Sequence, residues 1–238
     1  MTARGCDPHA DKTPLRMTAF FTLITRHHLS RIKNKKGERT MNKKREFVDN
    51  KKHSGMHMLY DLKENYNEQN TEYTIKQLKL LIEQDPDYLD PYIMLYEIFQ
   101  EEGNYFESII ILDSAYERAL HLITDKKGNW PDVLEWGWLE NRHIIRTLLN
   151  KALYFWMENQ TPDALNLLRK LLRTNPGDNI GARNYILAIR MGMSYDEFEN
   201  LFDIGGFYDA KMFRWFEENY KNFPDEFDWW EKAIEEIE

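Results

Sequence analysis

The chain has 238 residues and a formal net charge of −8, from 32 Lys or Arg against 40 Asp or Glu. This length allows one or two domains, and the single cysteine, Cys6, excludes an intrachain disulfide. One cysteine fits a reducing compartment, so a cytoplasmic location is expected. No apolar run approaches the roughly 20 residues that a membrane-spanning helix needs.

Positive charge is concentrated at the N-terminus. Residues 1–55 hold 14 Lys or Arg against 5 Asp or Glu, a net of +9, so residues 56–238 carry 18 against 35, a net of −17. Because 1–55 shows no sustained apolar periodicity, it is expected to be a solvated, disordered tail. The basic runs at 31–39 and 42–47 leave contact with nucleic-acid phosphates or a membrane surface as the alternative.

Two features of this tail bear on processing. Met17–Ile24 (MTAFFTLI) is apolar, but it is short and no small-residue cleavage site follows, so a signal peptide is not favoured. Met41 opens MNKKREF, which reads like a natural start. Residues 1–40 are therefore open to being a mis-assigned extension.

His53 and His57 are four residues apart, a spacing that suits two metal ligands on one helix face. No cysteine or third histidine stands nearby to complete a ligand set. We interpret both as ordinary surface histidines at a helix start, and we expect neither a metal nor a cofactor.

The apolar pattern predicts four helices in the first half of the folded part, over 56–66, 72–84, 91–102 and 106–122. A long helix is predicted over 133–158. In that helix Trp138 shares a side with Leu134 and is expected in the core. Trp136 lies on the more polar side of that helix. We nevertheless expect it to be buried, because aromatic residues tend to be buried, and the alternative is that it forms an exposed binding surface.

The clearest pattern runs from Thr161 to Gly192. Thr161 is predicted as an N-cap with Pro162 at the first helical position, where its missing N–H costs nothing. The run NPGD at 175–178 ends this helix, and a second apolar helix follows, so a helical hairpin is predicted. After a break at Gly205-Gly206, two aromatic-rich helices over 208–220 and 225–238 are expected to cap the apolar end of the fold. The alternative is an acidic-aromatic end that docks elsewhere.

A repeat underlies these helices. Ala164, Leu168 and Pro176 stand at the small, bulky and closing-proline positions of a repeat of about 34 residues. A second copy matches well, at Tyr92, Leu95, Phe99 and Gly103. Two further copies match in part, at Thr74, Leu78 and Pro86 and at Ala182, Tyr185 and Ile189.

On these residues the chain resembles the tetratricopeptide repeat (TPR) family over residues 56–204. The segments WGWLENR (136–142) and NPGDNIGAR (175–183) are similar to poorly characterised prokaryotic TPR-containing proteins. The resemblance implies an all-α fold, a right-handed stack of helix hairpins (an α-solenoid) at 56–204 with a C-terminal cap at 205–238.

In this family the first helices of successive repeats line a concave groove. Carried over to this chain, the groove positions imply a partner-binding set of Glu97, Arg146, Trp156, Arg183, Leu187 and Arg190. The Lys and Asn clamp for C-terminal carboxylates is replaced by Ile93, Glu97, Leu149 and Leu153, so that mode is not expected. An acidic peptide segment would complement the arginines. The alternative is that they pair with neighbouring carboxylates and bind nothing.

The sequence carries no Gly-rich phosphate loop, paired-cysteine motif or nucleophile elbow. A non-enzymatic protein-interaction scaffold is therefore predicted, with an unidentified protein or peptide as partner. The alternatives are a nucleic-acid-associated protein that uses the basic tail and a helical accessory subunit of an enzyme complex.

Overall fold

The computed structural model describes residues 44–205 and 208–236, and the regular structure in these ranges is helical apart from two isolated bridges. The α-helices are α1 (Met56–Asn65), α2 (Thr71–Gln84), α3 (Asp90–Glu101), α4 (Tyr105–Ile123), α5 (Arg142–Met157), α6 (Thr161–Thr174), α7 (Ala182–Arg190), α8 (Tyr195–Phe202), α9 (Lys211–Asn219) and α10 (Pro224–Glu235). The predicted all-α class is confirmed. Within these residues, no helix combines the length and apolar character that crossing a bilayer requires.

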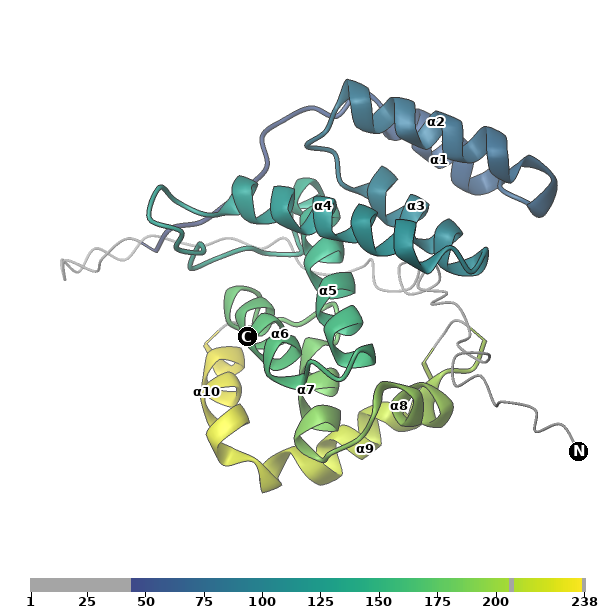
Figure 1. Ribbon diagram of the computed structural model, residues 1–238. Coiled ribbons are helices and arrows are strands. Elements are labelled where there is room, and N and C mark those ends of the chain that lie inside the picture. Colours follow the sequence, from purple (N-terminus) through teal and green to yellow (C-terminus); the bar gives the residue numbers. More distant parts are fainter. Residues whose placement is uncertain (1–43, 206–207, 237–238) are drawn as a thin grey trace, which may run out of the picture.

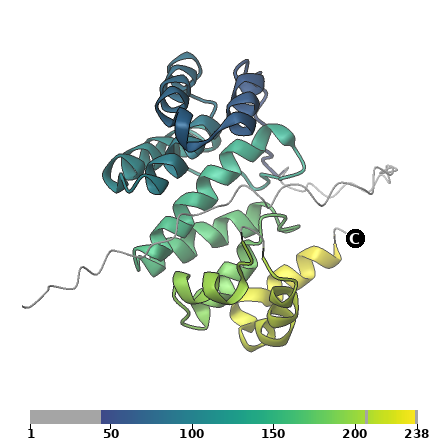
Figure 2. The ribbon, with the colours of Figure 1, turned by 90° about the vertical axis from the view of Figure 1, so that its right-hand side faces the viewer.

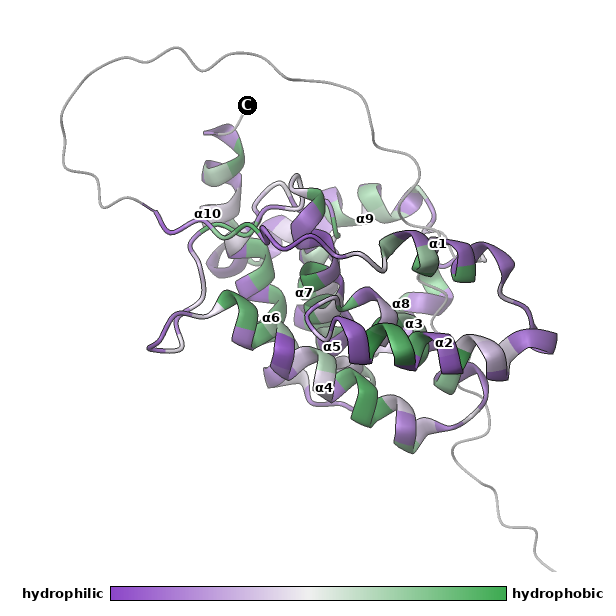
Figure 3. Cartoon of the chain, turned by 90° about the horizontal axis from the view of Figure 1, so that it is seen from above, coloured by the Kyte–Doolittle hydropathy of each residue, from purple (hydrophilic) through white to green (hydrophobic). Residues whose placement is uncertain are grey.

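From α2 to α7, helices that follow one another in sequence also pack against one another. Contacts join α2 to α3, α3 to α4, α4 to α5, α5 to α6 and α6 to α7. The chain descends from α1 and α2 at the top of Figure 1 to α9 and α10 at the bottom, and Figure 2 shows the same order from the side. Apolar and polar residues alternate along helices such as α2, α4 and α6 (Figure 3), because each helix buries one side and leaves the other in water.

The buried apolar side chains form two large clusters. The N-terminal cluster joins α1, α2 and α3, and consists of Leu59, Leu62, Leu78, Leu81, Tyr88, Met94, Leu95, Ile98 and Phe99. The main cluster extends from the start of α3 to α10 and includes most of the buried residues of α5, α6 and α7. Helix α3 contributes to both clusters, so it is the structural link between them.

The predicted contact positions in α6 are buried. Ala164 and Leu168 are both 0% exposed, and α6 packs on α5 and α7. The turn at Gly103, which joins α3 to α4, has a positive φ of 71° that suits glycine. One detail of the sequence prediction is wrong: α6 already includes Thr161, and Gln160 precedes it without a capping side-chain hydrogen bond.

The predicted helix over 133–158 is wrong in its first third, because α5 begins only at Arg142. The segment before it is a loop that ends in a short 3-10 turn over 139–141. The loop alters the expected burial of one tryptophan. Trp138 was expected in the core but is 44% exposed, whereas Trp136 is 6% exposed and therefore buried, as expected. The loop is held by contacts from a distant segment, which local periodicity does not reveal.

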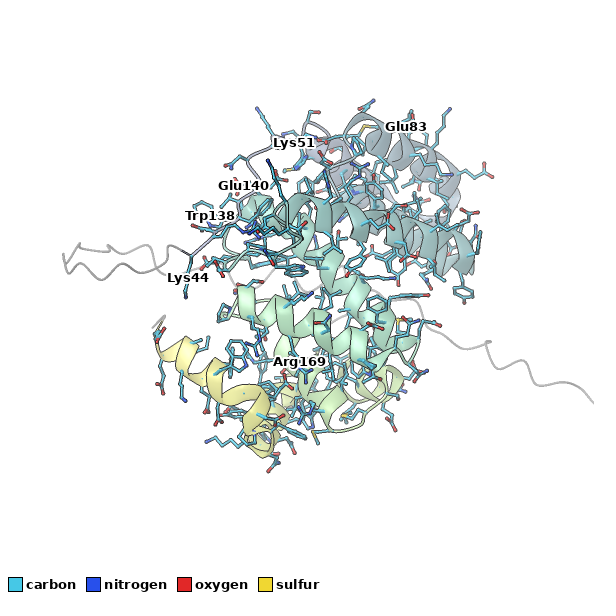
Figure 4. All side chains as sticks on the ribbon, turned by 60° about the vertical axis from the view of Figure 1, so that its left-hand side comes forward. Lys44, Lys51, Glu83, Trp138, Glu140 and Arg169 are labelled. Atoms are coloured by element: carbon cyan, nitrogen blue, oxygen red, sulfur yellow. The ribbon has the colours of Figure 1, made fainter. Side chains whose placement is uncertain are left out.

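That distant segment is residues 44–55, which the sequence assigned to a disordered tail. Its backbone runs beside the loop: the Arg45 N–H donates to the Asp132 carboxylate at 2.7 Å and the Phe47 N–H donates to the Val133 carbonyl at 2.9 Å. The Trp138 indole N–H donates to Glu46 at 2.9 Å, and Lys44 and Trp138 lie on the same side of the molecule in Figure 4. The predicted tail boundary at 55 is therefore wrong, and the prediction for 1–43 lies outside the described residues.

The C-terminal helices cover the lower end of the molecule. Helix α8 contacts α5 and α9 contacts α7. Helix α10 is tied to the α6–α7 hairpin, since the Trp230 indole N–H donates to the Pro176 carbonyl at 2.9 Å. Phe216 of α9 and Phe227 of α10 meet edge to face with centroids 5.5 Å apart.

Candidate functional site

Two members of the predicted groove are buried. Trp156 is 3% exposed and Leu187 is 0% exposed. The indole N–H of Trp156 donates to the Met193 carbonyl at 3.2 Å, and its ring packs edge to face on Tyr195 of α8 at 5.5 Å. The inclusion of Trp156 in the partner-binding set is wrong, because α8 covers that side of α5 and leaves the ring buried.

The two arginines of α7 are paired within the chain. Arg190 Nη1 lies 2.8 Å from both Asp225 Oδ2 and Glu226 Oε2. Arg183 Nη1 lies 3.6 Å from Asp178 Oδ2, and its guanidinium lies over the Phe216 ring at 5.2 Å. The pairing of Arg183 and Arg190 with carboxylates corresponds to the alternative that the sequence left open.

Arg146 of α5 is also paired. Its Nε donates to Asp90 Oδ1 at 2.8 Å, and its Nη2 bonds to the other oxygen of the same carboxylate. This two-point contact fixes the start of α3 against α5. The guanidinium also lies over the Trp136 ring, 5.8 Å from its centroid.

Glu97 of α3 is the exception among the predicted residues. Its side chain is half-buried, and within the described part of the chain it makes no hydrogen bond and no ion pair. Burial raises the pKa of this carboxyl to about 7, an effect that Lys63 and Arg146 partly oppose and that Glu101 and Asp90 reinforce. Glu97 therefore lies on a surface to which α1 brings Lys63 and α5 brings Arg146, here called the α1/α3/α5 face.

The most organised polar group in the described residues is a buried cluster of Asp49, His53 and His143, here called the histidine cluster. His53 Nε2 and His143 Nε2 lie 3.1 Å and 3.0 Å from the same oxygen, Asp49 Oδ2. The other nitrogen of His53, Nδ1, lies 2.7 Å from Asp85 Oδ2. Three distant parts of the chain meet here: the N-terminal segment, the α2–α3 connection and α5.

Hydrogen bonds and aromatic contacts complete this cluster. The Asp49 carboxylate also accepts the Lys51 N–H at 2.9 Å, while the Asp49 N–H donates to Asn141 Oδ1 at 3.0 Å. The His53 ring stacks on Tyr88 at 4.8 Å. Burial opposes ionisation of Asp49, but hydrogen bonds from His143 and His53 outweigh it and hold its pKa well below the usual range. Burial likewise opposes the charge on His53, and Asp49 and Asp85 raise its pKa in spite of it.

Asp49, His53 and His143 are the residue types of a metal site, and their ligand atoms lie within 4.8 Å of one another. The hydrogen bonds, however, do not suit a metal. The Leu89 N–H donates to His143 Nδ1 at 3.1 Å, so that nitrogen carries no proton. In neutral His143 the proton is then on Nε2, which donates to Asp49 and has no lone pair for a metal. The arrangement therefore fits a hydrogen-bonded network rather than a metal centre.

The interpretation of His53 as a surface histidine is wrong, because this residue is buried. His57 is exposed, and the true partners lie 4, 32 and 90 positions away at Asp49, Asp85 and His143. Because Asp85 and His143 are far from His53 in sequence, no local pattern indicates that His53 is buried among them. The chain brings the set together only because residues 44–55 fold back onto α5.

No protein-family model, curated protein or solved structure matches this chain.

Proposed function

We propose that this protein is a non-enzymatic, cytoplasmic protein-interaction module, built as a TPR-like right-handed stack of helix hairpins, whose partner binds the α1/α3/α5 face. The observation that supports this most directly is Glu97. A half-buried carboxylate without a partner in the described chain loses part of its hydration and gains no ion pair in return. A cationic side chain from another molecule would supply the missing contact.

This changes the expected chemistry of the partner. The arginines that suggested an acidic partner are matched by Asp90, Asp178, Asp225 and Glu226 of the same chain. The unmatched group is an acid, so the favoured partner is a peptide segment with a lysine or arginine. A partner of this kind binds more tightly as the pH rises through about 7. Below that pH, binding must also remove the proton from Glu97, and above it the carboxylate is already ionised.

The test is affinity capture by the full chain, compared between wild type, Glu97→Gln and Glu117→Gln. Glu117 is an exposed acid of α4, so the third protein has the same change of charge away from the proposed surface. We expect a partner that the wild type and Glu117→Gln retain and that Glu97→Gln loses. A partner retained equally by all three would place binding on another surface.

Residues 1–43 support a second candidate, association with nucleic acid. They contain 10 Lys or Arg against 3 Asp or Glu. Two of the basic residues just beyond them are already engaged: Arg45 donates to the Ile123 carbonyl at 3.1 Å, and Lys51 pairs with Asp85 at 2.7 Å. Salt-sensitive binding of nucleic acid that disappears when 1–43 are deleted would favour this candidate.

A further inference from the structure

Both ring nitrogens of His53 meet carboxylates. Nε2 lies 3.1 Å from Asp49 Oδ2, and Nδ1 lies 2.7 Å from Asp85 Oδ2. Both nitrogens can donate only when the ring is an imidazolium. The side chain is 3% exposed, so water cannot readily replace either contact.

We propose that His53 is a proton-operated clamp that holds the N-terminal segment 44–55 against the α2–α3 connection, and that loss of its proton loosens the segment together with the α1–α2 hairpin. This inference goes beyond the proposed partner binding and does not depend on it.

The clamp follows from the donor count. A neutral imidazole has one N–H, so it can serve Asp49 or Asp85 but not both. At the other nitrogen, a lone pair would then face a carboxylate oxygen about 3 Å away, which is repulsive. One of the two contacts must open, and residue 53 precedes the first residue of α1 by only three positions.

The other charged groups around His53 are already paired with one another. Lys51 pairs with Asp85 at 2.7 Å and with Asp87 at 3.1 Å, and Arg118 pairs with Asp87 at 2.9 Å. A hydrogen bond to Asp85 raises the pKa of Lys51, so Lys51 remains cationic while His53 titrates. His143 is already committed as a donor to Asp49 and an acceptor from Leu89. Tyr88, stacked on His53, keeps its proton because burial raises its pKa further.

The direction of the pH effect is determined by His53. Its pKa in the fold is raised above the ordinary value, so its contribution is complete below about 6.5 and disappears as the pH rises through the folded value. The clamp is therefore closed in mildly acidic solution and opens towards alkaline pH.

Hydrogen–deuterium exchange of the full chain tests the clamp, with wild type, His53→Gln and His57→Gln compared at about pH 6 and about pH 9, so that intrinsic exchange cancels at each pH. At about pH 6 we expect residues 44–55 to exchange more slowly in the wild type than in His53→Gln, because only the imidazolium of the wild type donates to Asp49 and Asp85 together. At about pH 9 the two should be alike. His57 is exposed, so its variant should follow the wild type. An equal difference at both pH values, or no difference, would overturn the proposal.

A second variant guards against failure of His53→Gln to fold. Asp85→Asn keeps the side-chain size and removes one of the two carboxylates that raise the His53 pKa. We expect the His53 ring to titrate at lower pH in this variant, as followed by its Cε1 proton in NMR spectra. An unchanged titration would contradict the clamp. So would loss of protection on adding EDTA at about pH 6, which would identify a metal centre instead.

Discussion

At the scale of single residues, charge pairing within the described chain distinguishes three arginines from one half-buried carboxylate. Arg146, Arg183 and Arg190 each meet a carboxylate of this chain, whereas Glu97 meets no cation within ion-pair distance in the described residues. The sequence reveals that all four are charged. It cannot reveal their pairing, because the partners of Arg146 and Arg190 lie 56 and 36 positions away.

Glu97→Gln should stabilise the protein at neutral and higher pH. The pKa of Glu97 is raised in the fold, so its ionisation opposes folding as the pH increases from the ordinary value through about 7. We expect a melting temperature about 2–4 °C higher than wild type at about pH 8, with little difference at about pH 5. Thermal unfolding at the two pH values measures this, with Glu117→Gln as the exposed control. A lower melting temperature would show that Glu97 is a structural group.

Glu226→Ala should weaken the C-terminal packing. Glu226 is 6% exposed and accepts hydrogen bonds from Arg169 at 2.7 Å and from Arg190 at 2.8 Å. Its removal leaves two guanidinium groups close together without their shared carboxylate, and we expect a loss of about 1–3 kcal/mol. Urea unfolding measures the loss, and Glu236→Ala, at an exposed position of the same end, should be nearly neutral. For the same reason, charge reversal of Arg183 and Arg190 should destabilise the fold before it affects any partner.

At the scale of helices, much of the architecture could be predicted from apolar spacing. The predicted helices at 72–84, 91–102 and 106–122 correspond closely to α2, α3 and α4. The failure at 133–141 has a physical cause. Helical spacing is present at Leu134, Trp138 and Ile145, but the backbone of this loop is hydrogen-bonded to residues 45–47 instead of to itself. A contact between residues almost 90 positions apart leaves no pattern in the local sequence.

The buried positions in α6 allow a test of helix packing. Ala164 lies at a close helix contact with no exposed surface, so Ala164→Leu should overpack it and cost about 1–3 kcal/mol. Leu168→Ala leaves a cavity in the main cluster and should cost about 2–5 kcal/mol. Equilibrium unfolding compares both with Leu165→Ala, a partly buried leucine of the same helix that should lose less. Equal losses at all three positions would mean that α6 is packed differently.

At the scale of the whole molecule, the two apolar clusters share α3, and the histidine cluster lies beside this junction. Tyr88 of the N-terminal cluster stacks on His53, and the next residue, Leu89, belongs to the main cluster and donates its N–H to His143. The α1–α2 hairpin is therefore attached to the rest through α3 and the N-terminal segment. Charge and apolar spacing together predicted an acidic helical body after a basic segment, but not that part of this segment is a component of the body.

This attachment predicts that the molecule is not equally stable throughout. The N-terminal cluster is small, so Leu78→Ala, at a fully buried position of α2, should open α1 and α2 while α5, α6 and α7 remain protected. Leu148→Ala, at a fully buried position of α5 in the main cluster, should instead lower protection in both regions, because α3 and the histidine cluster rest on α5. Hydrogen–deuterium exchange resolved by segment distinguishes the two variants. If Leu78→Ala reduced protection of α6 and α7 as strongly as that of α1 and α2, the molecule would unfold as one unit, and loosening of the hairpin alone by His53 would not be possible.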